Sequence, residues 1–293
     1  MKIGILGSGF GFYGYLPAIC GLGFTPVILQ DRRSRLRGRL ETADFESLAR
    51  FCESETELYE NSDALVIATT PPRQTQLIDV FLKNEKVKHY FLEKPLGIDS
   101  NEELRLMKNL EVSKSSFSIG YLFLWTDWFS ALGHEFRKPI PQEIRIDWIV
   151  SKPLNTWKTD ETLGGGLVSF YAPHLFSVFH SLGIDISEIS IKSLGNELNM
   201  MGTFADGKVL EVALKYGDAQ RFKIIRNSPS FEVLFIDETP FGPQNRPGIK
   251  DSRIPVIKRY LTSTLSTPEV DFYGICEFSI AARRIVEKQL KPD

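Results

Sequence analysis

The stretch from His89 to Gly97 ends in the residues best suited to chemistry in this chain. Four residues with strand preference, His89 to Leu92, run directly into Glu93, Lys94 and Pro95. The pattern predicts a buried strand that stops abruptly, and in an open α/β sheet ligands bind outside the carboxyl ends of the strands. A lysine held there can direct a compact charge, and burial can lower its pKa enough for proton transfer. A solvated Glu-Lys pair before a turn is the plain alternative, so the context decides.

A histidine in the second half of the chain is the other candidate for proton transfer. His174 stands ten residues after the first glycine of the run Gly164-Gly165-Gly166. A histidine titrates near neutrality and can accept or donate a proton. The segment from Leu167 to Leu182 is apolar and predicted to be helical, so a core histidine is the alternative. We give that plain interpretation to His180 in the same segment, and no role to His89 or His134.

A glycine-rich turn near the start of the chain predicts a dinucleotide site. The apolar run Lys2 to Leu6 leads into Gly7-Ser8-Gly9-Phe10-Gly11 and then into a predicted helix. Glycines permit a tight turn and let the backbone approach a pyrophosphate at the helix N-terminus. The spacing departs from the usual fingerprint, since Phe12 occupies the place of the third glycine and Gly11 lies beside it.

The end of the second predicted strand bears on the choice of cofactor. Thr25 to Gln30 ends at Asp31, and an acid roughly 20 residues beyond the glycines typically accepts the ribose hydroxyls of NAD. Arg32, Arg33 and Arg35 follow, and one of them could stack on adenine or pair with the 2′-phosphate of NADP. A solvated basic helix start is equally compatible with them. We predict NAD, with NADP open, and Asp31 and Arg32 as cofactor contacts.

Strands alternate with helices through the first 121 residues. The further predicted strands are Ala64–Thr69, Lys88–Leu92 and Ser116–Gly120, and the predicted helices are Gln74–Leu82 and Asn101–Leu110. Thr70 and Pro71 follow the first of these strands and are predicted to contact the cofactor. The alternation predicts a doubly wound parallel sheet of the Rossmann type over residues 1–121.

The pattern changes over residues 122–293. Alternating segments follow one another there: Glu143–Val150, Ile186–Ser193, Glu197–Phe204, Lys208–Lys215, Phe222–Ile225 and Phe231–Ile236. Asp206-Gly207 is a hairpin signal. Helices are predicted over Leu124–Phe136 and Ile275–Gln289, and a loop over Thr239–Arg253. The fold class is therefore α/β, with the Rossmann domain followed by an α+β domain built on a broad, mostly antiparallel sheet.

Composition excludes several classes of partner. The chain has 293 residues, 42% of them hydrophobic, and a formal net charge of −2 without a long basic run, so we expect no nucleic-acid partner. Three scattered cysteines show no ligand spacing, which predicts neither a disulfide framework nor a metal site. The chain opens with a strand, and no apolar run approaches the ~18 residues of a membrane span. We predict a reduced, cytoplasmic protein without a membrane partner.

The ordered set of motifs resembles a known family. Gly7-Ser8-Gly9-Phe10-Gly11 near Leu16-Pro17-Ala18, Ala68-Thr69-Thr70-Pro71-Pro72, Glu93-Lys94-Pro95-Leu96, Trp157-Lys158, and Gly164-Gly165-Gly166 followed by His174 occur in this order. The set is similar to that of the glucose-fructose oxidoreductase/inositol dehydrogenase/rhizopine catabolism (Gfo/Idh/MocA) family over nearly the whole chain. The resemblance implies a Rossmann domain, a second domain whose sheet has one open face, and a nicotinamide and substrate that meet between them.

The resemblance also implies roles for individual residues. Lys94 would contact the substrate hydroxyl and the nicotinamide ribose, and His174 would exchange the hydroxyl proton. Glu93 would lie beside the cofactor, and Tyr121, Trp157 and Tyr171 would line the substrate. The implied reaction is hydride transfer between NAD(P) and a hydroxyl carbon of a sugar, cyclitol or nucleotide sugar. An open sheet face would join a homo-oligomer, a dimer or tetramer.

Departures from the family pattern leave other functions open. Phe170 and Ser177 replace two frequent acids near the histidine, Thr75 replaces a frequent histidine, and Leu122-Phe123-Leu124-Trp125 replace polar residues. A phenylalanine cannot orient an imidazole. The alternatives are a lyase or glycosidase that uses transient NAD-dependent oxidation, and a non-catalytic nicotinamide-binding sensor or partner subunit.

Overall fold

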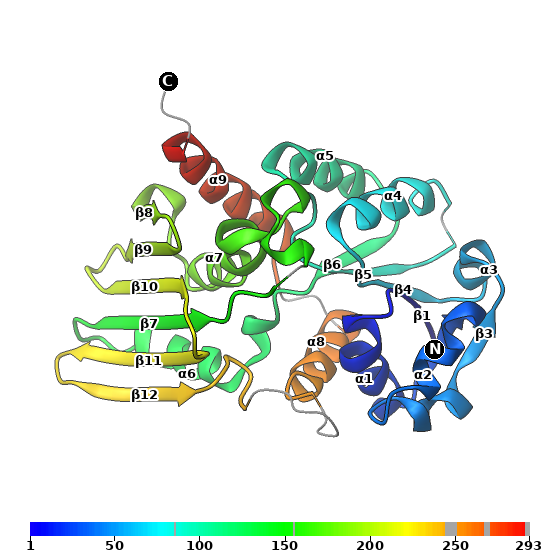
Figure 1. Cartoon of the computed structure of the whole chain (residues 1–293). Helices are drawn as coiled ribbons and strands as arrows, with labels where there is room; N and C mark the ends of the chain where they lie inside the picture. The colour runs from blue at the N-terminus through cyan, green and yellow to red at the C-terminus, as the bar shows by residue number, and fades with distance from the viewer. Residues whose placement is uncertain (85, 155, 244–250, 267–269, 291–293) are drawn as a thin grey trace. The chain divides into compact units, whose positions relative to one another are not determined.

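The computed structural model describes residues 1–84, 86–154, 156–243, 251–266 and 270–290, which divide into two compact units (Figure 1). Unit 1 comprises Met1–Gly97, Glu102–Gly120 and Asn245–Glu269, and unit 2 comprises Ile98–Asn101, Tyr121–Gln244 and Val270–Asp293. The main crossing from unit 1 to unit 2 lies beside the boundary expected after residue 121. A single cut does not describe the whole division, because a late segment returns to unit 1.

The returning segment contains helix α8 (Ile254–Ser266), for which the sequence patterns made no assignment. Its apolar face carries Ile257 and Tyr260, both fully buried. The Tyr260 hydroxyl lies 2.8 Å from Ser118 Oγ, and a Cβ on Gly14 would lie 3.1 Å from Ile257 Cδ1. Burial of this face against unit 1 explains why α8 belongs there despite its place late in the chain.

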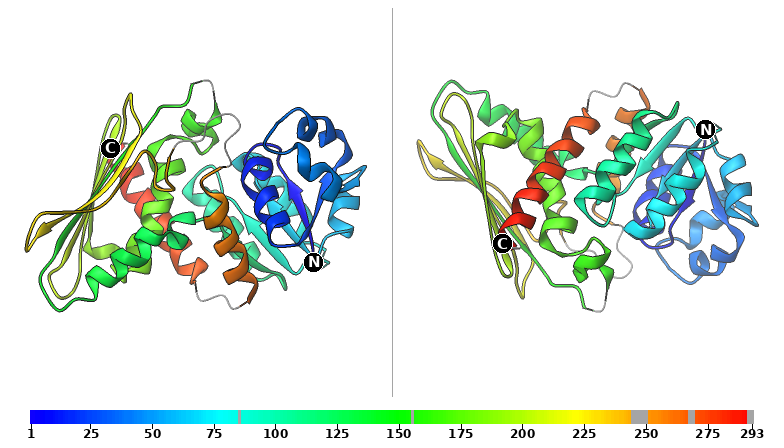
Figure 2. Two further views of the ribbon diagram at one scale, coloured as in Figure 1. Left: turned by 90° about the horizontal axis from the view of Figure 1, so that it is seen from below. Right: turned by 90° about the horizontal axis from the view of Figure 1, so that it is seen from above.

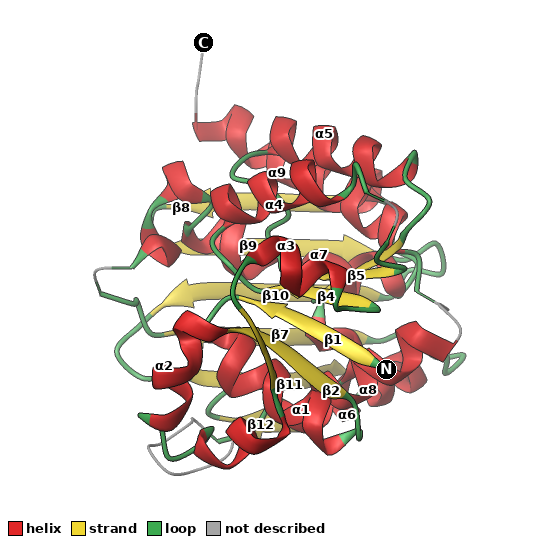
Figure 3. Cartoon of the chain, turned by 90° about the vertical axis from the view of Figure 1, so that its right-hand side faces the viewer, coloured by secondary structure: helices red, strands yellow, loops and turns green. Residues whose placement is uncertain are grey.

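Unit 1 is built on a six-stranded parallel sheet, called sheet A, in the order β3-β2-β1-β4-β5-β6. This is the order typical of dinucleotide-binding domains, and it confirms the predicted doubly wound sheet. Helices α4 and α5 lie on one face, and α1 and α8 lie on the other (Figures 1 and 3). The bounds are β1 Lys2–Leu6, α1 Leu16–Gly21, β2 Thr25–Leu29, α2 Arg33–Arg37, β3 Arg50–Cys52, α3 Glu55–Glu60, β4 Ala64–Ile67, α4 Pro71–Phe81, β5 His89–Leu92, α5 Ser100–Glu111 and β6 Ser116–Ile119.

Both units contain a short π-helical segment after a glycine-rich turn. One covers Gly11–Tyr15 and precedes α1, and the other covers Leu167–Tyr171 and precedes α7 (Ala172–Ser181). In each case a proline, Pro17 or Pro173, occupies the second position of the α-helix that follows. Proline has no N–H to donate to the preceding turn, so the regular hydrogen-bond ladder is interrupted there. Each predicted helix is therefore a π turn followed by an α-helix.

Unit 2 is built on a second six-stranded sheet, called sheet B, in the order β12-β11-β7-β10-β9-β8. Only the β7–β10 pair is parallel, so the predicted mostly antiparallel sheet is confirmed. Helices α6, α7 and α9 pack on one face, as Figure 2 shows. The bounds are α6 Asp127–Phe136, β7 Glu143–Val150, β8 Ile189–Leu194, β9 Glu197–Thr203, β10 Val209–Tyr216, β11 Arg221–Ser228, β12 Glu232–Asp237 and α9 Phe272–Leu290.

Among the described residues of unit 2, no helix covers the second face of sheet B (Figure 2). Charged side chains occupy its middle: the Arg145 guanidinium lies 2.8 Å from the Asp147 carboxylate and 3.4 Å from that of Glu211. Met201 stands opposite Glu211 and is exposed. The face thus combines an ion-pair network with exposed apolar side chains, Val233 and Ile236 on β12 among them.

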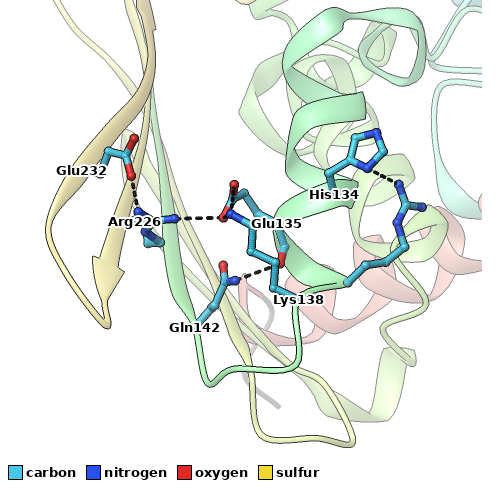
Figure 4. A network of polar contacts seen from close by, with 7 residues as sticks. His134, Glu135, Lys138, Gln142, Arg226 and Glu232 are labelled. Atoms are coloured by element: carbon cyan, nitrogen blue, oxygen red, sulfur yellow. Dashed lines mark hydrogen bonds and ion pairs between the residues drawn. The ribbon is translucent and has the colours of Figure 1, made fainter.

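A polar network anchors the β11–β12 edge of this sheet to the end of α6 (Figure 4). Arg226 donates to the Glu135 carboxylate at 3.0 Å and also bonds Glu232, while Gln142 donates to the Glu135 carbonyl at 2.8 Å. The Lys138 ammonium, with Arg226 beside it, lowers the pKa of Glu135. A carboxylate shared by two cations remains ionised. Through Arg226 it links the edge strands β11 and β12 to the end of α6.

Within the described part of the chain, no helix combines the length and apolarity needed to span a membrane. Cys20, Cys52 and Cys276 are free thiols.

Candidate functional site

Sheet A brings several predicted site residues to one edge. Leu6, Ile67 and Leu92 are the paired last residues of β1, β4 and β5. The residues that follow these strands therefore begin at the same carboxyl edge, which is where ligands bind in open parallel sheets. These are Gly7 to Gly11, Thr70 with Pro71, and Glu93 with Lys94. The structure shows this placement, and their roles stay predictions.

The glycines at positions 7 and 9 of the turn are explained by different structural features. Gly7 has φ +116°, and a Cβ there would lie 2.0 Å from the Ala68 carbonyl oxygen, so only glycine fits. A Cβ on Gly9 would meet nothing within 4 Å. The backbone at Gly9 therefore faces open space that a pyrophosphate can approach.

Gly11 takes the packing role expected of the third glycine. A Cβ on Gly11 would lie 2.9 Å from Ile5 Cγ2, so its absence lets the helix approach β1. Phe12, which occupies the usual place of that glycine in the sequence, is buried in the core. The packing role of the third glycine is thus taken one residue earlier in the sequence, by Gly11 in place of Phe12. The turn therefore still fits a dinucleotide.

Phe10 carries an aromatic ring that is already packed. The Arg253 guanidinium lies 4.3 Å from the centre of this ring, and the Tyr15 ring meets it edge-on at 5.3 Å. Arg253 is in turn paired with Asp251 at 2.7 Å. Phe10 is therefore available to a cofactor through its backbone, while its side chain holds the turn against the segment that leads into α8.

Gln74 holds the backbone on both sides of Lys94. Its side-chain amide donates to the carbonyl oxygens of Glu93 at 2.7 Å, Pro95 at 3.1 Å and Leu96 at 3.3 Å. Its carbonyl oxygen accepts the Glu93 N–H at 2.8 Å. Gln74 is fully buried on α4, so these bonds form in a low-dielectric setting where they resist exchange with water. We call Gln74 and the residues it holds the lysine clamp.

The Glu93 side chain is also held by a hydrogen bond from Tyr15. The Tyr15 hydroxyl donates to Glu93 Oε1 at 2.6 Å, and a Cβ on Gly120 would lie 2.8 Å from the same oxygen. Burial, and then the charge of Glu93, raise the pKa of Tyr15 well above its usual range, so the phenol remains a donor. Lys94 is 7% exposed, and its peptide bond to Pro95 is cis. The lysine side chain is therefore buried, and the backbone around it is held by Gln74.

The end of β2 does not present a lone acid. Asp31 is exposed and lies 3.3 Å from the Nε of Arg32. Arg35, one turn further on, donates to the Ser8 hydroxyl in the glycine turn at 2.5 Å. The acid that predicted NAD is therefore accompanied by cations, which changes the electrostatics of the expected ribose site.

His174 lies in an aromatic cluster of unit 2. Its ring stacks on Phe123 at a centroid distance of 4.6 Å and an angle of 15°, with Trp148 at 6.5 Å and Phe241 at 6.4 Å. The side chain is 7% exposed. These contacts show how the helix presents the imidazole, and its role in proton transfer stays a prediction.

The two residues that replace the family's acids are engaged elsewhere. Phe170 meets Trp157 edge-on at 5.1 Å and Tyr171 at 4.8 Å. The Ser177 hydroxyl donates to the His174 carbonyl at 2.7 Å. Neither Phe170 nor Ser177 supplies a carboxylate that could accept a hydrogen bond from the His174 imidazole.

The glycine triplet shapes the turn that carries Trp157. Gly164 and Gly166 have φ values of +80° and +87°, which favour glycine. A Cβ on Gly165 would lie 2.3 Å from the Trp157 carbonyl oxygen. The triplet therefore folds Trp157 close to the π turn that contains Phe170 and Tyr171, and the three side chains form a row of edge-to-face rings.

Tyr121 and three histidines have packing explanations. The Tyr121 side chain is buried, with its hydroxyl 3.4 Å from Cys276 Sγ, so its substrate contact stays a prediction. His180 faces Asp271 at 3.6 Å and His134 accepts from Arg137. His89 is buried between two serine hydroxyls, and desolvation lowers its pKa to about 4.

The sequence patterns missed Gln74 and Tyr15. Their contacts with Glu93 span 19 and 78 residues, and neither residue type signals such a contact locally. Among the described residues, no group of three acids, histidines and cysteines is arranged to hold a metal ion.

Comparisons with known proteins bear on the fold. No protein-family model matches the sequence, and no curated protein matches it significantly. Solved structures do match. A probable dehydrogenase from Thermotoga maritima has a TM-score of 0.73 at 16% identity, over 97% of this chain and 94% of that one. The WlbA dehydrogenase from Thermus thermophilus, in complex with NAD and UDP-GlcNAcA, has a TM-score of 0.68 at 14% identity, over 100% and 95%.

A third similar structure is a super-repressor mutant of Gal80p from Saccharomyces cerevisiae, with a TM-score of 0.70 at 13% identity over 98% and 94% of the two chains. At these identities the likeness establishes the fold. The similar structures include Gfo/Idh/MocA-type dehydrogenases, so the fold implied by the motifs is confirmed.

Proposed function

We propose that this chain is an NAD(P)-dependent oxidoreductase that transfers a hydride between nicotinamide and a hydroxyl carbon of a sugar, cyclitol or nucleotide sugar. The observation that carries the proposal is the shared edge of sheet A, where the open glycine turn and the clamped Lys94 lie together. Solved structures with this fold include the WlbA dehydrogenase in complex with NAD and UDP-GlcNAcA, a UDP-N-acetylglucosamine 3-dehydrogenase and a putative myo-inositol dehydrogenase, which supports a substrate of this class.

The residues of this chain divide the remaining work. The bound nicotinamide supplies the hydride chemistry. Lys94 polarises the substrate hydroxyl and favours its deprotonated form, because a nearby positive charge stabilises an alkoxide. His174 takes or returns the proton. Gln74 and Tyr15 hold the lysine turn so that this charge is placed before the substrate arrives.

Aromatic side chains supply the sugar contacts in this proposal. Trp157 and Tyr171 are half-buried, so each keeps ring surface that a sugar face can cover. Tyr121 is a weaker candidate, since its ring is buried. Substitution of Trp157 by Ala is expected to raise KM more than it lowers kcat.

Direct binding of the dinucleotide tests the proposal. We expect quenching or enhancement of NADH or NADPH fluorescence by the parent protein, and loss of this signal in Gly9→Val. A Cβ at Gly9 meets nothing within 4 Å, so we expect the valine side chain to extend into the space that the pyrophosphate would occupy. Gly133→Ala in α6, another glycine with open space, is the control. Parent-like binding by Gly9→Val would contradict the assignment of the turn.

A nicotinamide-binding sensor is the second candidate. Phe170 and Ser177 remove two acids from the neighbourhood of His174, and a mutant of Gal80p described as a super-repressor has the same fold. A panel of sugars and nucleotide sugars separates the two candidates. Dinucleotide binding without turnover on any of them would favour the sensor.

We further propose that the open face of sheet B joins a homo-oligomer, a dimer or tetramer. An uncovered face with exposed Met201, Val233 and Ile236 around an ion-pair network suits a second copy of itself. Light scattering tests this, and a strictly monomeric mass at micromolar concentration would remove the idea. Three free thiols support a reduced compartment, and we place the protein in the cytoplasm.

A further inference from the structure

We propose that Arg35 and Arg39 form a phosphate-binding pair beside Ser8 that makes NADP(H), rather than NAD(H), the preferred dinucleotide of this chain. The inference rests on the proposed function, since it requires a dinucleotide on the glycine turn. It names the form of that dinucleotide and two residues that select it, against the preference for NAD that Asp31 alone predicts.

Both guanidinium groups reach the glycine turn from the segment after β2. Arg35 Nη1 donates to the Ser8 hydroxyl at 2.5 Å, and Arg39 Nη1 lies 3.5 Å from the Ser8 carbonyl oxygen. Strands β1 and β2 are neighbours in sheet A, so these contacts bridge the ends of two adjacent strands. In a dinucleotide-binding sheet the adenosine ribose lies between these two ends, with its 2′ position toward the second strand.

The other arginines of this segment are already neutralised. Arg32 lies 3.3 Å from Asp31, and Arg33 and Arg37 each lie 2.6 Å from a different oxygen of Glu46. Hydrogen bonds from Arg37 and then Arg33 lower the pKa of Glu46 to about 2, so this carboxylate is ionised throughout the neutral range. Of the five arginines between residues 32 and 39, three therefore face a carboxylate.

Arg35 and Arg39 have no such carboxylate among the described residues. Arg253, the other arginine near the turn, is paired with Asp251. Arg35 is exposed and Arg39 is half-buried, and both are directed at Ser8. Both guanidinium groups therefore remain accessible to an anion that arrives with the ligand.

The chemistry of the 2′ position discriminates between the two dinucleotides. A phosphate monoester offers charged oxygens that two planar guanidinium groups can bind with paired hydrogen bonds, whereas a ribose hydroxyl offers none. Asp31 would repel the phosphate by itself, but its side chain is 62% exposed and its charge is offset by Arg32. The balance at this edge therefore favours the phosphorylated ribose.

Dissociation constants measured by fluorescence at fixed salt test the inference without any need for turnover. We expect NADPH to bind at least about 10-fold more tightly than NADH, and adenosine 2′,5′-bisphosphate to compete better than ADP by a similar factor. R35Q and R39Q should each weaken NADPH binding by roughly 10- to 100-fold and NADH binding by less than about 3-fold. R37Q, on the same segment but directed at Glu46, is the matched control and should change neither.

Each other outcome has a distinct meaning. Equal or tighter binding of NADH overturns the inference and leaves the proposed function intact. Equal losses for both dinucleotides in R35Q would show that Arg35 only supports the turn, and would also overturn it. If the parent binds neither dinucleotide, the proposed function fails and the inference fails with it.

Discussion

Lys94 and His174 lie in different surroundings within their units. The backbone around Lys94 is fixed by hydrogen bonds: Gln74 contacts it on both sides, and Tyr15 holds the neighbouring Glu93 carboxylate. His174 instead stacks on Phe123 in an aromatic cluster. Hydrogen bonds fix direction and distance closely, whereas ring packing fixes position with less directional control.

The difference teaches which half of the proposed chemistry is more firmly specified. A lysine on a backbone held in this way suits one task in the proposed mechanism, the stabilisation of negative charge on a substrate oxygen. Phe170 and Ser177 offer His174 no carboxylate, and its ring stacks on Phe123. We expect the loss of the Lys94 side chain to lower turnover more than the loss of the His174 imidazole.

Lys94→Ala is expected to have the largest effect. The substitution removes the charge that would stabilise the alkoxide and contact the nicotinamide ribose, so turnover should fall by more than about 10⁴-fold and NADH binding should also weaken. Steady-state kinetics and fluorescence titration measure the two effects. Lys88→Ala, an exposed lysine before the same strand, should change neither. Turnover within tenfold of the parent would end the assignment of Lys94 as a catalytic residue.

His174→Asn is expected to lower turnover by about 10²–10⁴-fold, the usual range for general acid–base assistance. NADH binding should stay nearly unchanged, because the role assigned to the residue is on the substrate side. His180→Asn on the same helix, where the imidazole faces Asp271, is the matched control. Unchanged turnover in His174→Asn would make the histidine a core residue and favour the sensor.

We expect the stability of unit 1 to fall at acid pH because of His89. Desolvation lowers the folded-state pKa of this histidine to about 4, from an ordinary value of 6.5. Because protonation then favours the unfolded chain, the contribution to stability is complete above pH 6.5 and is lost as the pH falls toward 4, by roughly 3 kcal/mol. Urea unfolding at several pH values measures this. His89→Gln should flatten the dependence, and an equally steep loss in that variant would assign it to other groups.

Gln74→Leu is expected to have the smallest effect of the four. The side chains are similar in size, but the change leaves buried carbonyl groups and the Glu93 N–H without their partner, at a cost of about 2 kcal/mol in the free energy of unfolding. Gln76→Leu on the exposed side of α4 controls for the substitution itself. If Gln74→Leu is as stable as the parent and equally active, the lysine clamp does not position Lys94.

Local patterns in the sequence were sufficient for most of the fold. The apolar runs of β1, β4 and β5 and the alternation in β7 predicted these strands to within two residues, because period and burial are local properties. The three residues of β3 were missed, since so short an edge strand leaves almost no pattern. Helix α8 was missed as a part of unit 1, because its assignment depends on packing against residues more than a hundred positions earlier.

The sequence by itself determined that a glycine turn follows the first strand, that Lys94 ends another, and that a histidine follows a glycine triplet. These are facts of residue type and spacing. Only the tertiary structure decided that Gly11 has the packing role of the third glycine, whose place in the sequence Phe12 occupies. The tertiary structure also decided that Gln74 holds the lysine turn and that Arg35 is directed at Ser8. The physical reason is that a hydrogen bond or a charge pair is set by distance in space, and residues far apart along the chain carry no local signal of their meeting.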